Sequence, residues 1–303
     1  MMRAPEIRVL HKSPDIVGEG PLWLPESGEV AWVDIPAGKL HRMPLAGGPV
    51  TTLSFDISPS ALARDLEGDL IVAAGTGWHR LAGDGSLLPI ASPAMPDAGW
   101  RMNDGCVDLD GRFWTGSLAE PRASGVPGRL FRLDRSGGVA ELDGLQTQNG
   151  LAVSPEGTTL YLADSHPEVN TIWAFDLDRG SGRLSNRRVF HRPQEGRVDG
   201  AAMDVEGCYW FAGIDAGRIT RLSPEGEVLA HIDLPVSRPT KLAFCGHDLK
   251  TICVTSMSIL PEGRTAADEP LAGAVFMFAS DVAGMPVPPV SVLPDDHGQK
   301  ELQ

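Results

Sequence analysis

Four polar residues occupy one position of a pattern that repeats along the sequence. The pattern is a short apolar run, a tight turn that ends in glycine, and a second apolar run. Asn103, Asn149 and Asp199 each lie eight residues before the turn glycine of their repeat, and Glu19 lies nine before Gly28. If the repeats surround a common axis, two carboxylates and one or two carboxamides meet there.

A group of this composition is typical of a metal site. Clustered carboxylates repel one another and lose hydration unless a cation neutralises them. Acidic side chains with asparagine form an all-oxygen donor set, which suits a hard divalent ion such as Ca²⁺, Mg²⁺ or Mn²⁺. The alternative is that each residue caps its own turn, because Asn-Gly and Asp-Gly are common turn signals. The metal site is favoured because these residues occupy nearly the same position in their repeats.

The repeats predict the fold. The clearest repeat has an expected strand over residues 201–205, a Glu206-Gly207 turn and a second strand over residues 208–212. Glycine suits such a turn because it tolerates positive φ angles. Six variants occur, over residues 18–43, 61–82, 102–133, 149–177, 198–222 and 239–278. Strand-turn-strand-loop-strand patterning with a period of roughly 40 to 50 residues is typical of propeller blades. We therefore predict an all-β, six-bladed β-propeller.

Segments between the repeats complete the expected blades. Residues 48–55 and 184–189 are expected to form fourth strands. Residues 6–10 are expected to pair in the last blade, which would seal the ring and cover its strand edges. Residues 1–303 are treated as one domain. A two-sheet sandwich is the alternative, and the regular repeat disfavours it.

The composition limits the partners of the protein. The 303 residues carry a formal net charge of −14, which argues against nucleic acid or an anionic membrane as the main partner. No apolar run is long enough to span a membrane, and residues 1–10 lack the apolar core of a secretory signal. A cytoplasmic location is therefore expected. The four cysteines match no zinc or disulfide spacing and are expected to be core residues.

Short motifs along the chain have the order and spacing of a known family. They are Gly18-Glu19-Gly20-Pro21-Leu22-Trp23, Arg101-Met102-Asn103-Asp104-Gly105, Gly116-Ser117-Leu118-Ala119-Glu120, Asn149-Gly150-Leu151, Leu184-Ser185-Asn186-Arg187-Arg188 and Asp199-Gly200. Together they resemble the regucalcin (senescence marker protein)/gluconolactonase family over roughly residues 15–280. Each motif alone is weak, but their order and spacing are specific.

The resemblance implies a six-bladed propeller with metal-dependent lactonase activity. Its implied metal ligands are Glu19, Asn149 and Asp199. Its implied substrate contacts are Arg101, Asn103 and Glu120. Asp199 would also act as the general base. The family's lid segments, around residues 91–99 and 121–127, are expected to shape the pocket.

The expected reaction is hydrolysis of a small-molecule sugar lactone to its aldonic acid. One divalent metal ion (Ca²⁺, Mg²⁺, Mn²⁺, Zn²⁺ or Fe²⁺) would polarise the ester carbonyl and lower the pKa of a bound water. Motifs of serine hydrolases and nucleotide enzymes are absent from the sequence. Two alternatives remain open, namely an aryl-ester or organophosphate hydrolase on the same scaffold and a non-enzymatic calcium-binding propeller. For Arg101, pairing with acidic residues at the surface is the alternative to a substrate contact.

Overall fold

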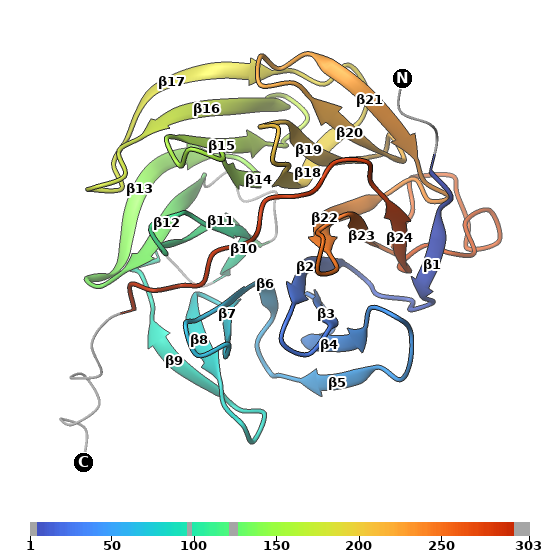
Figure 1. The fold of residues 1–303 in the computed structure, drawn as a ribbon, viewed down its shortest axis with the longest axis horizontal. Coiled ribbons are helices and arrows are strands. Elements are labelled where there is room, and N and C mark those ends of the chain that lie inside the picture. Colours follow the sequence, from blue (N-terminus) through green and yellow to red (C-terminus); the bar gives the residue numbers. More distant parts are fainter. Residues whose placement is uncertain (1–4, 96–98, 121–126, 294–303) are drawn as a thin grey trace.

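Six four-stranded sheets are arranged around a central axis in the computed structural model of the protein (Figure 1). The structure describes residues 5–95, 99–120 and 127–293. Within these ranges the regular secondary structure is entirely β-strand, and no helix that could cross a membrane is found. The architecture is a six-bladed β-propeller, which confirms the fold predicted from the sequence.

The first three blades follow one another along the chain, each with its innermost strand first. Blade 1 contains β2 (Gly18–Leu24), β3 (Glu29–Asp34), β4 (Lys39–Pro44) and β5 (Thr51–Ser54). Blade 2 contains β6 (Pro59–Arg64), β7 (Leu70–Ala74), β8 (Gly77–Leu81) and β9 (Leu87–Ala91). Blade 3 contains β10 (Trp100–Val107), β11 (Phe113–Ala119), β12 (Gly128–Asp134) and β13 (Gly137–Leu145).

The last three blades continue the same order. Blade 4 contains β14 (Gln148–Val153), β15 (Thr159–Asp164), β16 (Thr171–Leu177) and β17 (Leu184–His191). Blade 5 contains β18 (Arg197–Met203), β19 (Tyr209–Ile214), β20 (Arg218–Leu222) and β21 (Val228–Asp233). Blade 6 contains β22 (Pro239–Cys245), β23 (Thr251–Ser256), β24 (Val275–Ala279) and, from the other end of the chain, β1 (Arg8–His11).

The ring is closed by a strand from the N-terminal end. β1 pairs antiparallel with β24, with Arg8 opposite Met277. The last blade therefore contains segments from both ends of the chain, and this strand covers an edge that would otherwise be unpaired. The predicted closure and the predicted fourth strands at β5 and β17 are all confirmed.

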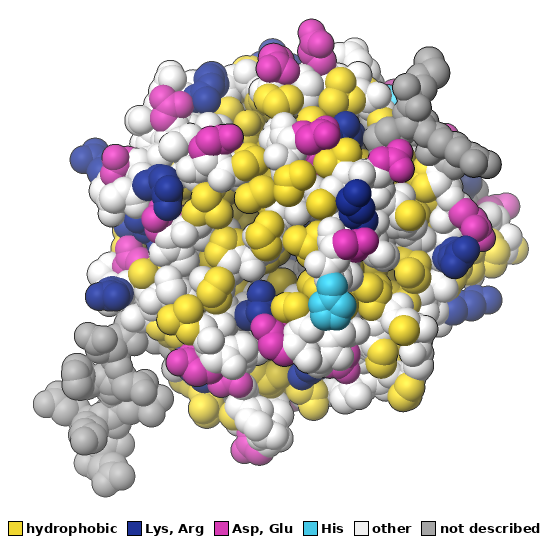
Figure 2. Space-filling model, viewed as in Figure 1, with side chains coloured by type: hydrophobic (Ala, Val, Ile, Leu, Met, Phe, Trp, Pro, Cys, Tyr) yellow, Lys and Arg dark blue, Asp and Glu magenta, His cyan; other side chains and the backbone are white. Residues whose placement is uncertain are grey.

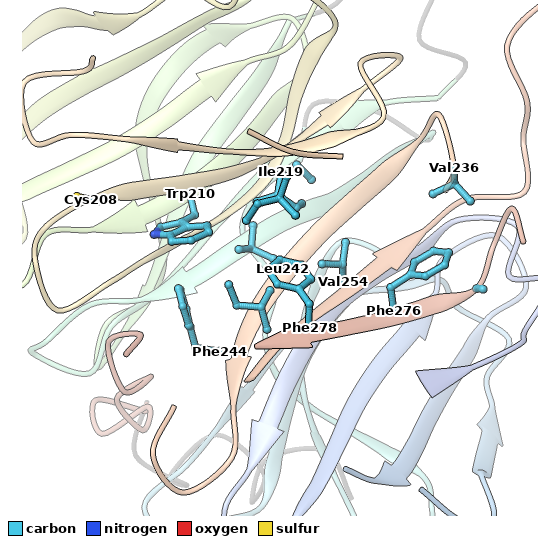
Figure 3. Close-up of a cluster of buried hydrophobic side chains, with 13 residues drawn as sticks. Cys208, Trp210, Ile219, Val236, Leu242, Phe244, Val254, Phe276 and Phe278 are labelled. Atoms are coloured by element: carbon cyan, nitrogen blue, oxygen red, sulfur yellow. The ribbon is translucent and has the colours of Figure 1, made fainter. Parts of the chain in front are cut away.

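The hydrophobic core lies between neighbouring blades. Between blades 5 and 6, Trp210 packs edge-on against Phe244, with ring centroids 5.7 Å apart, and Leu242 and Val254 belong to the same buried cluster (Figure 3). Strands that are apolar on both faces suit this packing, because each sheet is covered on either side by another sheet. The four cysteines are free thiols, and three of them are buried.

A C-terminal strap, residues 282–291, crosses one face of the ring (dark red in Figure 1). Its backbone N–H groups donate to the carbonyl oxygens of Met203 (2.9 Å) and Arg64 (2.6 Å), where two innermost strands end. Ser291 likewise donates to Gly111, in the turn after β10. The strap therefore lies at the end of the channel opposite to the starts of the innermost strands. Figure 2 shows a broad band of hydrophobic side chains across the middle of this face.

The strap closes a cavity in the channel. The cavity has a volume of about 120 Å³ and is lined mainly by apolar side chains of the innermost strands. Gly20, Gly105 and Lys241 line it as well, and residues 285–287 of the strap also contribute to its wall. The strap thus covers one mouth of the channel and leaves the mouth at the starts of the innermost strands, which we call the open mouth, uncovered.

Replacing Gly284 by alanine is expected to destabilise the strap. A Cβ atom there would lie 2.0 Å from Cγ of Phe244, so the ring or the strap must move. Overpacking of this kind costs about 1–3 kcal/mol in the free energy of unfolding. Gly83→Ala is the matched control, because nothing lies within 4 Å of that position. Thermal or urea unfolding checks the prediction, and equal stability of the two variants would contradict it.

Candidate functional site

Each innermost strand contains one residue more than its neighbour at one point, which is a β-bulge. In blade 5, Val198 pairs with Gly213 and Ala201 pairs with Phe211, so Asp199 lies within the bulge. A bulge bends its strand and redirects the side chains there. The same irregularity in all six blades therefore presents side chains from the strand starts to the channel.

The polar residues predicted to converge lie at these bulges, near the open mouth of the channel. Glu19 and Asn149 are the last paired residues before a bulge, whereas Asn103 and Asp199 lie inside one. All four are buried, with at most 7% of their surface exposed. Burial raises the pKa of Glu19 well above its ordinary value, and the Asp199 carboxylate raises it further. The structure thus brings these two acidic side chains close together.

Asn149 is held in one orientation by its surroundings. Its Nδ2 donates to Ser165 Oγ over 2.8 Å, and Ser165 Oγ in turn donates to the Thr147 carbonyl. The amide oxygen is therefore on the other side, where it is available as an acceptor. The backbone after it is fixed too, because Gly150 has a φ of 59° and its carbonyl accepts a 2.7 Å hydrogen bond from Tyr209 Oη.

The three predicted substrate residues form a hydrogen-bonded chain that ends at Asn149. Arg101 Nε donates to Glu120 Oε1 (2.7 Å), and Arg101 Nη1 donates to Asn103 Oδ1 (2.8 Å). Asn103 Nδ2 then donates to Asn149 Oδ1 (2.8 Å). Arg101 therefore pairs with an acidic group and also contacts the channel residue Asn103, while its role as a substrate contact stays a prediction. The chain joins the predicted substrate residues to a predicted metal ligand.

A buried ion pair in the channel was missed by the sequence analysis. Lys241 Nζ donates to Asp104 Oδ1 and to the carbonyl of Gly105, 2.9 Å away. Burial lowers the pKa of Lys241, but Asp104 and Glu19 outweigh this and the net shift is upward. Gly200 makes room for the lysine, because a Cβ there would lie 2.3 Å from the Lys241 Cγ. One internal cation thus lies near two acidic side chains, Asp104 and Glu19.

Blade 6 departs from the repeat pattern. Arg238 lies eight residues before Gly246, but the bulge of β22 contains Thr240 and Lys241. The count fails because Gly246 is the first of the five residues between β22 and β23, whereas Gly207 is the fourth of the five between β18 and β19. Matching the strand starts of blades 5 and 6 directly would have placed Lys241 beside the channel.

A second acidic cluster lies at the turn of blade 5, away from the channel mouth. Asp204, Glu206 and Cys208 have ligand atoms close enough to hold an ion. However, Arg221 Nη2 lies 2.7 Å from the Asp204 carboxylate and 2.6 Å from that of Glu206. In blade 3, Asp108 receives equivalent bonds from its turn and from an arginine. The cluster is therefore a structural feature of the repeat in which one arginine pairs with both carboxylates.

The match to a known family spans this whole site. Residues 17–258 match the family model described as SMP-30/Gluconolactonase/LRE-like region. The chain belongs to this family. The resemblance seen in the sequence motifs is thereby confirmed, and the matched span includes every channel residue from Glu19 to Lys241.

Relatives and solved structures agree with this membership. The chain is 37% identical to a 6-deoxy-6-sulfogluconolactonase of Pseudomonas putida over 284 residues, covering 93% of this chain and 97% of the relative. It is 33% identical to regucalcin of Gallus gallus, covering 89% and 93%. A crystal structure described as a calcium-binding protein, regucalcin, from Agrobacterium tumefaciens superposes with a TM-score of 0.89 at 27% identity, covering 95% and 98%.

The predicted lid segments can be compared with the structure only in part. Residues 96–98 and 121–126 lie outside the described residues. Glu120, directly before the second of these segments, is exposed and is tied to Arg101. Within the residues that the structure describes, this ion pair therefore lies next to the second predicted lid segment.

Proposed function

We propose that this protein is a metal-dependent lactonase that opens a sugar lactone to its aldonic acid. The observation that carries the proposal is the burial of Glu19 and Asp199 together at the end of the channel that the strap leaves open. The name of the Pseudomonas putida relative supports a hydrolase of this class. Names that include regucalcin and calcium-binding protein support a divalent cation.

The residues in the channel fit a divalent cation. Burial and then the Asp199 carboxylate raise the pKa of Glu19, and Lys241 offsets them only in part. Asn149 adds an amide oxygen whose direction Ser165 fixes. Glu19, Asn149 and Asp199 would hold the ion, and their oxygen atoms suit Ca²⁺, Mg²⁺ or Mn²⁺ and tolerate Zn²⁺ or Fe²⁺. When bound, such an ion supplies Lewis-acid polarisation of the ester carbonyl and lowers the pKa of a bound water.

The protein residues would position the lactone and move the proton. Arg101, Asn103 and Glu120 offer both donors and acceptors, which a polyhydroxylated ring requires. Asp199 would accept a proton as water adds to the carbonyl carbon and return it to the ring oxygen as the C–O bond breaks. Binding and proton transfer would thus take place along the Arg101–Asn103–Asn149 chain and at Asp199.

Removing bound metal is expected to lower the melting temperature, and adding it back is expected to restore it. A ligand at 100 times its Kd stabilises the folded state by about 2.7 kcal/mol. The ion must displace a proton from Glu19, whose pKa burial raises, so metal affinity should fall as the pH is lowered. Melting curves of chelator-treated protein with each metal check this. Glu19→Gln should lose most of the metal-dependent shift, and a full shift in that variant would argue against the ligand set.

A substrate panel tests the reaction class. Sugar lactones should be hydrolysed faster than aryl esters or organophosphates, because the mouth carries an arginine, an asparagine and a glutamate. Faster hydrolysis of the apolar esters would favour the aryl-ester alternative. Metal binding with no turnover of any substrate would favour a non-enzymatic calcium-binding propeller.

A further inference from the structure

Two further arginines lie at the open mouth of the channel, between blades 5 and 6. Arg197 begins β18, two residues before Asp199, and Arg238 directly precedes β22. Their side chains are partly exposed, by 25% and 18%. Two residues of extended strand span about 7 Å, so the backbone positions of Arg197 and Asp199 are about as far apart as the two ends of a small sugar.

Both arginines pair with one carboxylate. Arg197 Nη2 lies 3.1 Å from Asp215 Oδ2, and Arg238 Nε lies 2.6 Å from Asp215 Oδ1. Two positive charges are thus opposed by one negative charge, which leaves this group with a net charge of +1. Arg101 differs, because it has its own partner in Glu120. This local excess of positive charge contrasts with the formal net charge of −14 of the whole chain.

The two guanidinium groups are held in place. Asp215 adopts a φ of 67°, which a non-glycine residue rarely adopts, and its N–H donates to the Ser237 carbonyl over 2.9 Å. Arg238 Nη1 also donates to the carbonyls of Ile259 and Leu260, each 3.3 Å away. Preorganised guanidinium groups bind oxyanions well because their planar fork matches two acceptor oxygens and less rotamer entropy is lost.

We propose that Arg197 and Arg238 form a subsite for an oxyanion on the sugar lactone, at the end remote from the ester that is hydrolysed. The proposal rests on the lactonase function and names its substrate class. The ligand group is a sulfonate, a phosphate or a carboxylate, which share the chemistry that two arginines recognise. Asp215 positions the pair and, as a carboxylate, weakens its attraction for an anion.

The test compares ligands that carry an oxyanion at C6 with ligands that lack it, in the metal-loaded protein. The kinetic arm uses D-gluconolactone and its 6-sulfo, 6-phospho and 6-carboxylate counterparts. We expect kcat/KM for at least one anionic lactone to exceed that for gluconolactone by about 10-fold or more. The preferred member identifies the oxyanion. The ratio should fall towards unity in Arg197→Gln/Arg238→Gln through a rise in KM, and Arg188→Gln on the outer strand of blade 4 should leave it unchanged.

A binding arm separates failure of this proposal from failure of the lactonase function. Calorimetry with 6-phosphogluconate, a 6-sulfonated gluconate and a dicarboxylic aldarate, each against gluconate, requires no turnover. Wild-type protein should bind at least one ligand with the added oxyanion at C6 more tightly than gluconate, and Asp215→Asn should strengthen that preference while the arginine variant loses it. No preference in wild type for any ligand with the C6 oxyanion, or a preference that survives in the folded double variant, would overturn the subsite. Binding preference without hydrolysis would support the subsite and count against the lactonase.

Discussion

Asp199→Asn is expected to lower kcat for lactone hydrolysis by about 10³-fold or more, the loss typical of removing a general base. The side chain keeps its shape but loses the negative charge that would bind the metal and accept the proton. Its buried position beside Glu19 excludes bulk water as a ready substitute. The measurement is proton release from a sugar lactone under saturating metal, corrected for spontaneous hydrolysis.

Asp233→Asn is the matched control for this substitution. Asp233 ends the outermost strand of the same blade and is exposed. Its replacement should leave kcat within about twofold of wild type, as surface substitutions do little. Retention of most of the activity in Asp199→Asn would contradict the role assigned to this carboxylate, provided that the variant melts near the wild-type temperature.

Asp104→Ala is expected to destabilise the protein by about 3–5 kcal/mol, because it leaves the buried Lys241 ammonium without its partner. The carboxylate also accepts hydrogen bonds from the backbone N–H groups of Gly105 and Leu151, each over 2.8 Å. The loss therefore affects blades 3, 4 and 6 together. Urea unfolding of the metal-free protein measures it without interference from ligand binding.

An exposed ion pair provides the comparison. Asp176 and Arg188 lie 2.7 Å apart with about half of each side chain exposed, and exposed pairs of this kind contribute little to stability because solvent screens them. Asp176→Ala should therefore cost far less than Asp104→Ala. The double variant Asp104→Ala/Lys241→Met should cost less than the sum of its single variants, since the unpaired charge is gone. A loss in Asp104→Ala no larger than that in Asp176→Ala would show that Asp104 and Lys241 do not depend on each other.

The fold could be predicted because each repeat contains the glycine that its turn requires. Gly207 has a φ of 79° and Gly157 a φ of 73°, so the turn glycines mark real strand ends. The innermost strands precede those turns at a nearly constant distance, which is why counting back found Glu19, Asn149 and Asp199 at the bulges. The closure of the ring by residues 8–11 could be predicted equally well, because the last repeat supplies only three of its four strands.

The missing parts of the site depended on packing that a sequence pattern does not contain. Lys241 was missed because the glycine at the beginning of the blade 6 turn shifts the count, and because its partner Asp104 is 137 positions away in the chain. The orientation of Asn149 depends on Ser165 from the loop after β15, and no spacing rule links the two residues. The strap was not anticipated either, since residues 282–291 form no regular strand.

The most direct test of the central claim is the rate of proton release from D-gluconolactone by chelator-treated protein to which single divalent metals are added back. If Glu19, Asn149 and Asp199 hold the metal, the stripped protein should be inactive. At least one metal should then restore fast hydrolysis that saturates with substrate. Hydrolysis that is equally fast without metal would contradict the metal dependence. Hydrolysis no faster than the spontaneous reaction with every metal, across the whole set of neutral and anionic lactones, would contradict the lactonase function itself.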